Sequence, residues 1–231
     1  MTTSLRRIFE HIDIKKDYSE VDFTGFEVDL QGWGSEHQLF DQAIVASQPK
    51  LIIEVGSWKG ASAYNMLNIC KSKGLNSEII CIDTWLGSND TLWLNSNFRS
   101  SLRLKNGYPT IFWQFIFNMI QSGMIEAVYP LPMTSSAAYH LLKRFEIAAD
   151  LIYIDAGHEH EEVYSDLSSY YHLLRPGGIM LCDDYLAQWP GLVSAVNRFI
   201  AEKKLAVTAF NGKCAFIKPV EANYATPAQA A

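Results

Sequence analysis

The chain has 231 residues, of which 48% are hydrophobic and 19% charged, so it is long enough to bury a core without disulfides or metal ions. Its formal net charge of -6 provides no general attraction to nucleic acid or anionic membranes, so neither is an expected partner. No run approaches about 18 uninterrupted apolar residues and the N-terminus lacks the apolar centre of a signal peptide, so we expect a cytoplasmic protein.

Short apolar runs alternate with longer amphipathic stretches, which is typical of an α/β domain with a mainly parallel sheet. The runs that we interpret as parallel strands are residues 51–55, 78–83, 126–131, 150–155 and 178–183. Helical patterns cover residues 60–72, 110–122, 134–146, 159–174 and 190–203. Because the strand runs are almost continuously apolar, we expect helices on both faces of the sheet.

The C-terminal part of the pattern differs from the rest. Two strand-like runs, LAVTAF and CAFIKP, flank Asn211-Gly212, and this dipeptide favours a tight hairpin because both residues tolerate positive φ. We therefore expect an antiparallel pair at one edge of the sheet. The main domain is predicted to span residues 49–219, with an N-terminal helical cap at 1–48 and a disordered tail at 220–231.

A long connection follows the second predicted strand. Residues 85–122 are rich in aromatic side chains, and the segment leaves the sheet beside the predicted site. Long segments in compact domains are often lids or binding elements, so we predict a lid-like insertion. The alternative is that the aromatic residues at 112–117 belong to the core or to the interface of a homo-oligomer.

The stretch LIIEVGSWKGASAYNML, residues 51–67, combines a strand, a turn with two glycines and a helix. Ligands of open α/β sheets bind beyond the carboxyl ends of the strands, and Gly56 and Gly60 allow a tight turn there. Asp83 ends the next strand, where its carboxylate can accept hydrogen bonds from ribose hydroxyls. The combination predicts a nucleoside-type cofactor.

Residue 58 bears on which cofactor binds. A dinucleotide site has the pattern G-x-G-x-x-G, with a helix N-terminus open to pyrophosphate. Trp58 stands where the second glycine of that pattern would be, and its side chain would obstruct a pyrophosphate. Trp58 therefore disfavours the alternative function of a nicotinamide-dependent oxidoreductase. It permits a cofactor that has no phosphate groups.

The pattern E-x-G-x-x-x-G, the acid ending the second strand and the terminal hairpin together resemble the class I S-adenosylmethionine-dependent methyltransferases. The resemblance covers residues 48–218 and implies a Rossmann-like sheet of seven strands in the order 3-2-1-4-5-7-6, with strand 7 antiparallel. It implies that the turn passes the methionine part of the cofactor and that Asp83 holds the ribose. The implied cofactor residues are Glu54, Gly56, Ser57, Gly60, Asp83, Thr84, Trp85 and Ser135.

Three acids fall at the ends of two predicted strands. Asp155 ends the fourth, and Asp183 and Asp184 end the fifth. Neighbouring strand ends lie about 5 Å apart, so these carboxylates converge beside the cofactor site. Converging carboxylates repel one another, and oxygen ligands suit Mg²⁺, Ca²⁺ or Mn²⁺, so we predict a divalent cation here. The alternative is that one or two of the acids cap helices.

Within the methyltransferases, IDAGHEHEEV and DDY resemble the metal-dependent O-methyltransferases of natural-product sugars, the macrocin, mycinamicin and novobiocin type. The resemblance implies that Asp155, Asp183 and Asp184 bind magnesium and that His158 is the base. Asp155 and His160 stay alternative bases. A metal that binds a hydroxyl lowers its pKa, and an imidazole can take the proton at neutral pH.

The predicted function is therefore metal-assisted O-methylation of a hydroxyl on a small polar metabolite or a sugar, with S-adenosylmethionine as the methyl donor. Two alternatives stay open, the nicotinamide-dependent oxidoreductase and a non-catalytic nucleoside-binding module of the same fold. The acceptor is not encoded in a readable motif.

Overall fold

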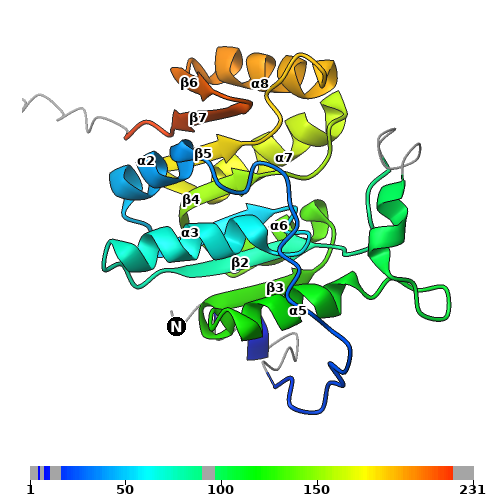
Figure 1. Cartoon of the computed structure of the whole chain (residues 1–231). Helices are drawn as coiled ribbons and strands as arrows, with labels where there is room; N and C mark the ends of the chain where they lie inside the picture. The colour runs from blue at the N-terminus through cyan, green and yellow to red at the C-terminus, as the bar shows by residue number, and fades with distance from the viewer. Residues whose placement is uncertain (1–4, 6–7, 11–16, 90–96, 221–231) are drawn as a thin grey trace, which may run out of the picture.

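The computed structural model describes residues 5, 8–10, 17–89 and 97–220. Within these residues, seven strands form one sheet in the order β3-β2-β1-β4-β5-β7-β6 (Figure 1). Their bounds are β1 Leu51–Val55, β2 Glu78–Asp83, β3 Val128–Pro132, β4 Ala149–Ile154, β5 Leu174–Cys182, β6 Val207–Phe210 and β7 Lys213–Ile217. The predicted tail after residue 220 lies outside the described residues, as do parts of the predicted cap and insertion.

The strand directions confirm the predicted topology. Strands β1 to β5 pair in parallel, whereas β7 runs antiparallel to both β5 and β6. The register aligns Val55 of β1 with Ile82 of β2 and Ile154 of β4, and Ile154 with Cys182 of β5. The residues after this row therefore meet at one edge of the sheet, at the point where the strand order reverses.

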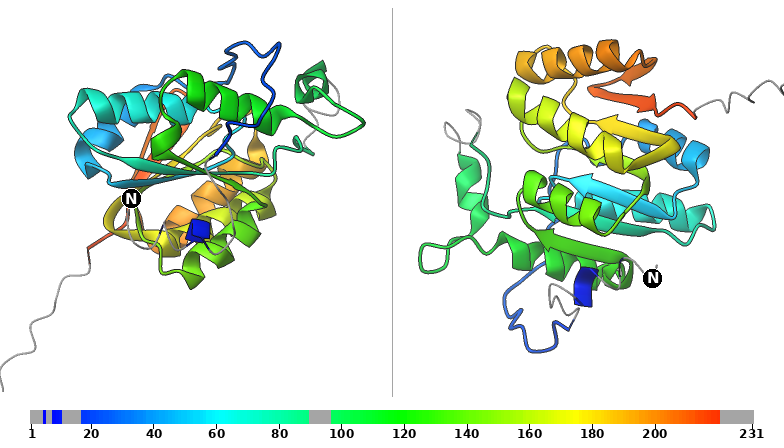
Figure 2. Two further views of the ribbon diagram at one scale, coloured as in Figure 1. Left: turned by 90° about the horizontal axis from the view of Figure 1, so that it is seen from below. Right: turned by 180° about the vertical axis from the view of Figure 1, so that it is seen from behind.

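Two layers of helices cover the sheet, as predicted (Figure 2, left). Helices α2 (Gln38–Ser47), α3 (Ala61–Ser72) and α5 (Ile111–Gln121) pack on one face, and α6 (Ser135–Arg144), α7 (His160–Leu173) and α8 (Pro190–Lys203) on the other. The 3-10 helices η1 (Asn97–Leu102) and η2 (Ile125–Ala127) lie in the connection between β2 and β3. No helix in the described part of the chain is long and apolar enough to span a bilayer.

The strands alternate between the two cores. Ile52 and Leu151 pack with α2, α3 and α5, whereas their neighbours Ile53 and Ile152 pack with α6, α7 and α8. All four side chains are fully buried. This explains why the parallel strands read as continuous apolar runs, since each successive side chain enters a different but equally apolar layer.

Strand β5 begins at Leu174, earlier than the predicted residue 178. Pro176 and Gly177 lie between the predicted helix at 159–174 and the predicted strand at 178–183. The structure instead accommodates them by an irregularity in the pairing with β4 between Ala149 and Leu151, and Gly177 takes a positive φ of 78°. Such an irregularity depends on the partner strand, so β5 alone does not reveal it.

The aromatic part of the insertion belongs to the core. Helix α5 buries Ile111, Phe115 and Met119 against the same layer as α2 and α3. This is the alternative that the aromatic pattern allowed for residues 112–117. Ser88 and Asn89, at the start of the insertion, lie on the ligand pocket described below, and residues 90–96 lie outside the described residues. A lid role for this segment stays a prediction.

The N-terminal segment before α2 is attached to α5 by buried amides. Asn118 accepts a hydrogen bond from Asp29 N (3.0 Å) and donates to Asp29 O (2.7 Å), and Gln114 Nε2 donates to Glu27 O (2.8 Å). The Lys59 ammonium, in the turn after β1, lies 2.6 Å from Asp29 Oδ2. These bonds fix residues 27–29 and place Trp33 at the sheet edge. Among residues 17–48, only α2 is helical.

Candidate active site

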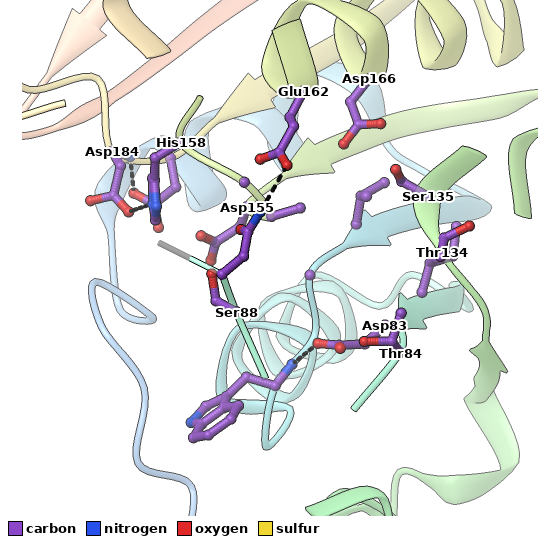
Figure 3. Close-up of a pocket in the computed structure, with 18 of the residues that line it drawn as sticks. Asp83, Thr84, Ser88, Thr134, Ser135, Asp155, His158, Glu162, Asp166 and Asp184 are labelled. Carbon is purple, nitrogen blue, oxygen red and sulfur yellow. Dashed lines mark hydrogen bonds and ion pairs between the residues drawn. The ribbon is translucent and has the colours of Figure 1, made fainter. Parts of the chain in front are cut away.

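A pocket of about 820 Å³ opens at the carboxyl ends of β1, β2, β4 and β5. Asp83 and Thr84 lie at one end of it, Asp184 and His158 at the other, and Asp155 between them (Figure 3). The volume is within the range of small-molecule sites. Its lining includes seven acids and, among the described residues, no lysine or arginine.

The turn after β1 passes directly over the end of β4. Gly56 has φ 91°, and a Cβ atom there would lie 1.7 Å from the Asp155 carbonyl oxygen. Its N–H donates to Ile82 O of β2 at 2.8 Å. Gly60 has φ 86°, and a Cβ there would meet Met119 at 2.7 Å. The two glycines therefore serve close approach, one to β4 and one to α5.

Asp83 holds this turn in place. Its Oδ2 accepts hydrogen bonds from the N–H groups of Ser57 (3.1 Å) and Trp58 (2.9 Å), and its Oδ1 accepts from Trp85 N (2.7 Å). Burial raises the pKa of Asp83, opposed by these backbone donors. A carboxylate offers about four acceptor positions, so the three backbone bonds leave capacity for a ligand hydroxyl.

The predicted cofactor residues separate into two groups. Gly56, Asp83, Thr84 and Ser135 line the pocket. Trp85 does not, because its indole is buried against Phe112 and Phe115 and donates from Nε1 to Trp58 O at 2.7 Å. The side chains of Glu54 and Ser57 and the backbone of Gly60 are likewise buried. Their cofactor contacts stay predictions.

Glu54 is a fully buried acid at the end of β1. Its Oε1 accepts a 2.5 Å hydrogen bond from the Ser62 hydroxyl of α3. Burial raises its pKa to about 7, and the Ser62 bond opposes this rise only in part. Glu54 therefore lies under the turn and ties β1 to α3 instead of facing the pocket.

Several pocket residues carry no signal of their own in the sequence. Thr134 caps α6 by accepting from Ala137 N (3.2 Å). Asp166, in the middle of α7, is buried beside Ser135, and burial raises its pKa to about 6. Trp33 and Trp189 come from segments far apart in the chain. An acid on the buried face of an amphipathic helix is the one detectable hint, and it applies to Asp166.

The three predicted acids do meet at the edge of the sheet. Asp155 and Asp183 follow β4 and β5, and Tyr153 lies beneath both, with its hydroxyl 3.0 Å from Asp155 Oδ2 and 2.5 Å from Asp183 Oδ2. Burial and the charge of Asp183 raise the pKa of Asp155 well above its usual range, while Lys213 lowers it. Burial and the two carboxylates also raise the pKa of Tyr153.

His158 lies against Asp184. Its Nε2 is 2.9 Å from Asp184 Oδ2, and its ring stacks on Trp189 with centroids 3.9 Å apart and planes at 11°. Asp184 has φ 53°, and its N–H donates to Asp183 Oδ1 at 2.8 Å. Gly191 of α8 approaches the loop so closely that a Cβ would lie 2.8 Å from His158 O. His160 begins α7, and its ring instead stacks near Tyr164.

The acids do not form a metal site as they are arranged. Asp183 is ion-paired with Lys213 and bonded to Tyr153, and Asp184 is paired with His158. In the described part of the chain, no group of three or more His, Cys, Asp or Glu side chains could hold a metal ion. The predicted divalent cation therefore lacks support from this donor set, although the residues lie together as expected.

The glycine turn and Asp83, the acid after β2, thus occupy one pocket of an open α/β sheet. The same pocket holds the acidic edge, which consists of Asp155, Asp183 and Asp184. A family model described as a methyltransferase domain matches residues 53–185. The chain belongs to this family. The match covers the strands β1 to β5 and every element that builds the pocket except the segments around Trp33 and Trp189.

Several solved structures share this fold at low sequence identity. The O-methyltransferase NovP superposes with a TM-score of 0.57 at 18% identity, covering 79% of each chain. An O-methyltransferase from Bacillus cereus, solved with SAH, gives 0.55 at 12% identity, covering 94% of this chain and 92% of that one. A putative caffeoyl-CoA O-methyltransferase from Staphylococcus aureus gives 0.58 at 14%, covering 93% and 97%.

One curated relative has a similar sequence. The uncharacterized protein R132 of Acanthamoeba polyphaga mimivirus is 31% identical over 153 residues, which are 65% of this chain and 59% of that protein. The chain thus spans less than two thirds of that relative. Together with the family match, the fold confirms the prediction of a class I S-adenosylmethionine-dependent methyltransferase, and the oxidoreductase alternative gains no support.

Proposed function

We propose that this methyltransferase transfers the methyl group of S-adenosylmethionine to a hydroxyl of a small polar molecule bound in the same pocket. The observation on which this rests most is the Asp184–His158 pair, an acid–base pair at the edge of the pocket opposite Asp83. Structural neighbours include O-methyltransferases solved with S-adenosylmethionine or its product SAH, which supports the donor and the hydroxyl acceptor.

The cofactor would lie along the carboxyl ends of β1 and β2. Asp83 has one acceptor position left after its three backbone bonds, and a ribose hydroxyl suits it. The methionine part would pass Gly56, where the lack of a side chain leaves the backbone accessible. Thr134, Ser135 and Asp166 would surround the adenine, and the Asp166 carboxylate would accept a hydrogen bond from the exocyclic amine of the adenine.

The acceptor would lie between Asp155, His158 and Trp33. Trp33 is 47% exposed and lines the pocket, so it offers an apolar face to a ring or a sugar. Seven acids and, within the described ranges, no lysine or arginine line the pocket, which disfavours an acceptor with phosphate or carboxylate groups. We therefore propose a neutral or cationic acceptor. Nucleic acid is not a proposed partner, and a homo-oligomer stays a prediction.

The chemistry needs an acceptor for one proton. The hydroxyl oxygen bonds to the sulfonium methyl carbon as the carbon–sulfur bond breaks, which releases the thioether product and leaves the hydroxyl proton to be removed. Asp184 is the more exposed member of the pair, at 30% against 15% for His158. We propose that the Asp184 carboxylate accepts the hydroxyl proton and shares it with His158 Nε2 at 2.9 Å, while Trp189 holds the His158 ring in place.

Magnesium assistance, which the resemblance implied, would use Asp155, Asp183 and Asp184. A bound divalent ion would lower the pKa of the hydroxyl. In the described arrangement Lys213, Tyr153 and His158 occupy these carboxylates, so no step of the proposed reaction is assigned to a metal.

A screen with S-adenosylmethionine bearing a deuterated methyl group tests the proposal. Purified protein is incubated with neutral sugars, amino sugars, sugar acids and catechols, and both SAH release and the mass of each acceptor are followed. The proposal expects SAH release together with a labelled methyl ether on a neutral or cationic acceptor. Labelling of a nitrogen, or a preference for sugar acids, would contradict it. Asp184→Asn is the matched inactive control.

A further inference from the structure

We propose that Lys213 is the resident cation of the acidic edge and that it takes the place of a divalent metal there. Its ammonium forms an ion pair with Asp183 and donates to the Tyr153 hydroxyl at 2.9 Å. It is 1% exposed, so the ammonium is shielded from bulk solvent. Lys213 thus provides one positive charge in contact with Asp183 and close enough to act on the Asp155 carboxyl.

The sheet register brings Lys213 to this position. Strands β5 and β7 are antiparallel and pair Cys182 with Cys214, so the residue after Cys182 falls opposite the residue before Cys214. Those residues are Asp183 and Lys213. The ion pair is therefore a consequence of the register between β5 and β7, and it does not depend on a flexible loop.

The surroundings of the ammonium are closed on every side that the structure describes. It lies 5.3 Å from the ring centroid of Phe40 and 5.1 Å from that of Tyr153. The N-terminal segment covers it, because a Cβ on Gly34 would lie 3.2 Å from Nζ. A buried lysine is costly unless it is paired, and an apolar side chain would suit such surroundings better. The charge therefore has a purpose other than packing.

The charge of Lys213 fixes the position of Asp183 and, through it, that of Asp184. Lys213 holds Oδ2 of Asp183, while Oδ1 of Asp183 accepts a hydrogen bond from Asp184 N at 2.8 Å. The bond fixes the left-handed turn at Asp184, which presents its carboxylate to His158 at 2.9 Å. Lys213 is therefore a positioning residue that acts on the base through Asp183.

A metal ion would compete with Lys213 for the same oxygen. Asp183 Oδ2 already meets the ammonium and the Tyr153 hydroxyl, and a divalent ion placed there would be repelled by a positive charge at contact distance. Removal of the ammonium would leave three carboxylates converging without a cation. This arrangement favours oxygen-binding divalent ions, so the proposal predicts that metal binding appears when Lys213 is neutralised.

The test uses Mn²⁺ as the probe, followed by its electron paramagnetic resonance signal and by calorimetry. The wild-type protein should show no Mn²⁺ site with a dissociation constant below about 1 mM. Lys213→Met should gain a Mn²⁺ site whose dissociation constant is at least tenfold lower than that limit. Lys213→Arg, which keeps the charge, should behave like the wild type. Adding Asp183→Asn to Lys213→Met should remove the gained site. Lys218→Met is the matched control, because Lys218 donates to the carbonyls of Tyr171 and Leu174.

Two results would overturn the proposal. One is stoichiometric micromolar binding of Mn²⁺ to the wild-type protein, which decides the question even if Lys213→Met does not fold. The other is a folded Lys213→Met protein that gains no site. Neither measurement uses a methyl acceptor, so failure here is separate from failure of the proposed O-methylation, which S-adenosylmethionine binding and the acceptor screen test.

Discussion

The backbone of Gly56 lies so close to that of Asp155 that a Cβ atom on Gly56 would be 1.7 Å from the Asp155 carbonyl oxygen. This approach joins the turn after β1 to the start of the acidic edge after β4. No rotation of a side chain can relieve the overlap, because both atoms belong to or are fixed by backbone.

Gly56→Ala should therefore lower the free energy of unfolding by more than about 3 kcal/mol, from the overlap and from the strain of φ 91°. Gly74→Ala is a matched control, since Gly74 also has a positive φ of 72° but has open space around its Cβ position. It should cost only about 1 to 2 kcal/mol. Urea denaturation of the wild type, Gly56→Ala and Gly74→Ala measures the two losses in the free energy of unfolding. Equal losses would contradict the close approach.

Asp83→Asn should weaken S-adenosylmethionine binding. The amide keeps one acceptor oxygen, so its NH2 group must face either Trp85 N or the N–H groups of Ser57 and Trp58; the turn loosens and a ribose hydroxyl loses a charged acceptor. A lost charged hydrogen bond corresponds to about 1.5 to 3 kcal/mol, so the dissociation constant should rise by at least tenfold. Asp41→Asn, at an exposed acid of α2 paired with Lys73, should change nothing. Calorimetry compares them.

Glu54→Gln should change how stability depends on pH. The folded protein raises the Glu54 pKa from 4.5 to about 7, so the folded state holds this proton more tightly than the unfolded chain. The stability associated with protonated Glu54 is complete below about pH 4.5 and is lost as the pH rises through about 7. The variant, which stays neutral, should gain up to about 3 kcal/mol relative to wild type across this window.

Unfolding in urea at several pH values between these limits measures the difference. Glu20→Gln, at an exposed position of the N-terminal segment, is the control and should follow the wild-type curve. Parallel curves for wild type and Glu54→Gln would mean that the buried carboxyl is not protonated in the folded state.

His158→Ala should lower the rate of methyl transfer to the acceptor found by the screen. A positioned base typically contributes about 10² to 10⁴ in rate, and the S-adenosylmethionine affinity should stay within about twofold. Asp184→Asn should lower the rate similarly. Because the two side chains act as one pair at 2.9 Å, the double variant should be no slower than the worse single variant. Single-turnover rates give the comparison.

His140→Ala is the control for this series, since His140 lies on the exposed side of α6 and away from the pocket. Multiplying losses in the double variant would show that His158 and Asp184 act independently, which would contradict the proposed pair.

The sequence predicted the sheet because its signals are local. Continuous apolar runs, the Asn211-Gly212 turn and helical spacing each lie within one element, and the strand order and directions followed from the family resemblance. The start of β5 was predicted too late, since Pro176-Gly177 is accommodated by the neighbouring strand β4. Pairing between elements is what a single run of residues does not reveal.

The site was predicted in part for the same reason. Strand-end residues such as Gly56, Asp83 and Asp155 share the pocket because parallel strands end at a common edge. The resemblance implied a cofactor contact for Trp85, whose indole packs in the core with α5; that contact stays a prediction. The partners Tyr153 and Lys213 were missed because they meet the acids only through the register of β4, β5 and β7.

Calorimetric titration of the purified protein with S-adenosylmethionine and with NAD, each in the presence of a metal chelator and of magnesium, tests directly whether the pocket is a metal-independent S-adenosylmethionine site. We expect one site of micromolar affinity for S-adenosylmethionine, equally strong with chelator and with magnesium, and no binding of NAD. Preferential binding of NAD, or no binding of S-adenosylmethionine to a folded protein, would contradict this expectation.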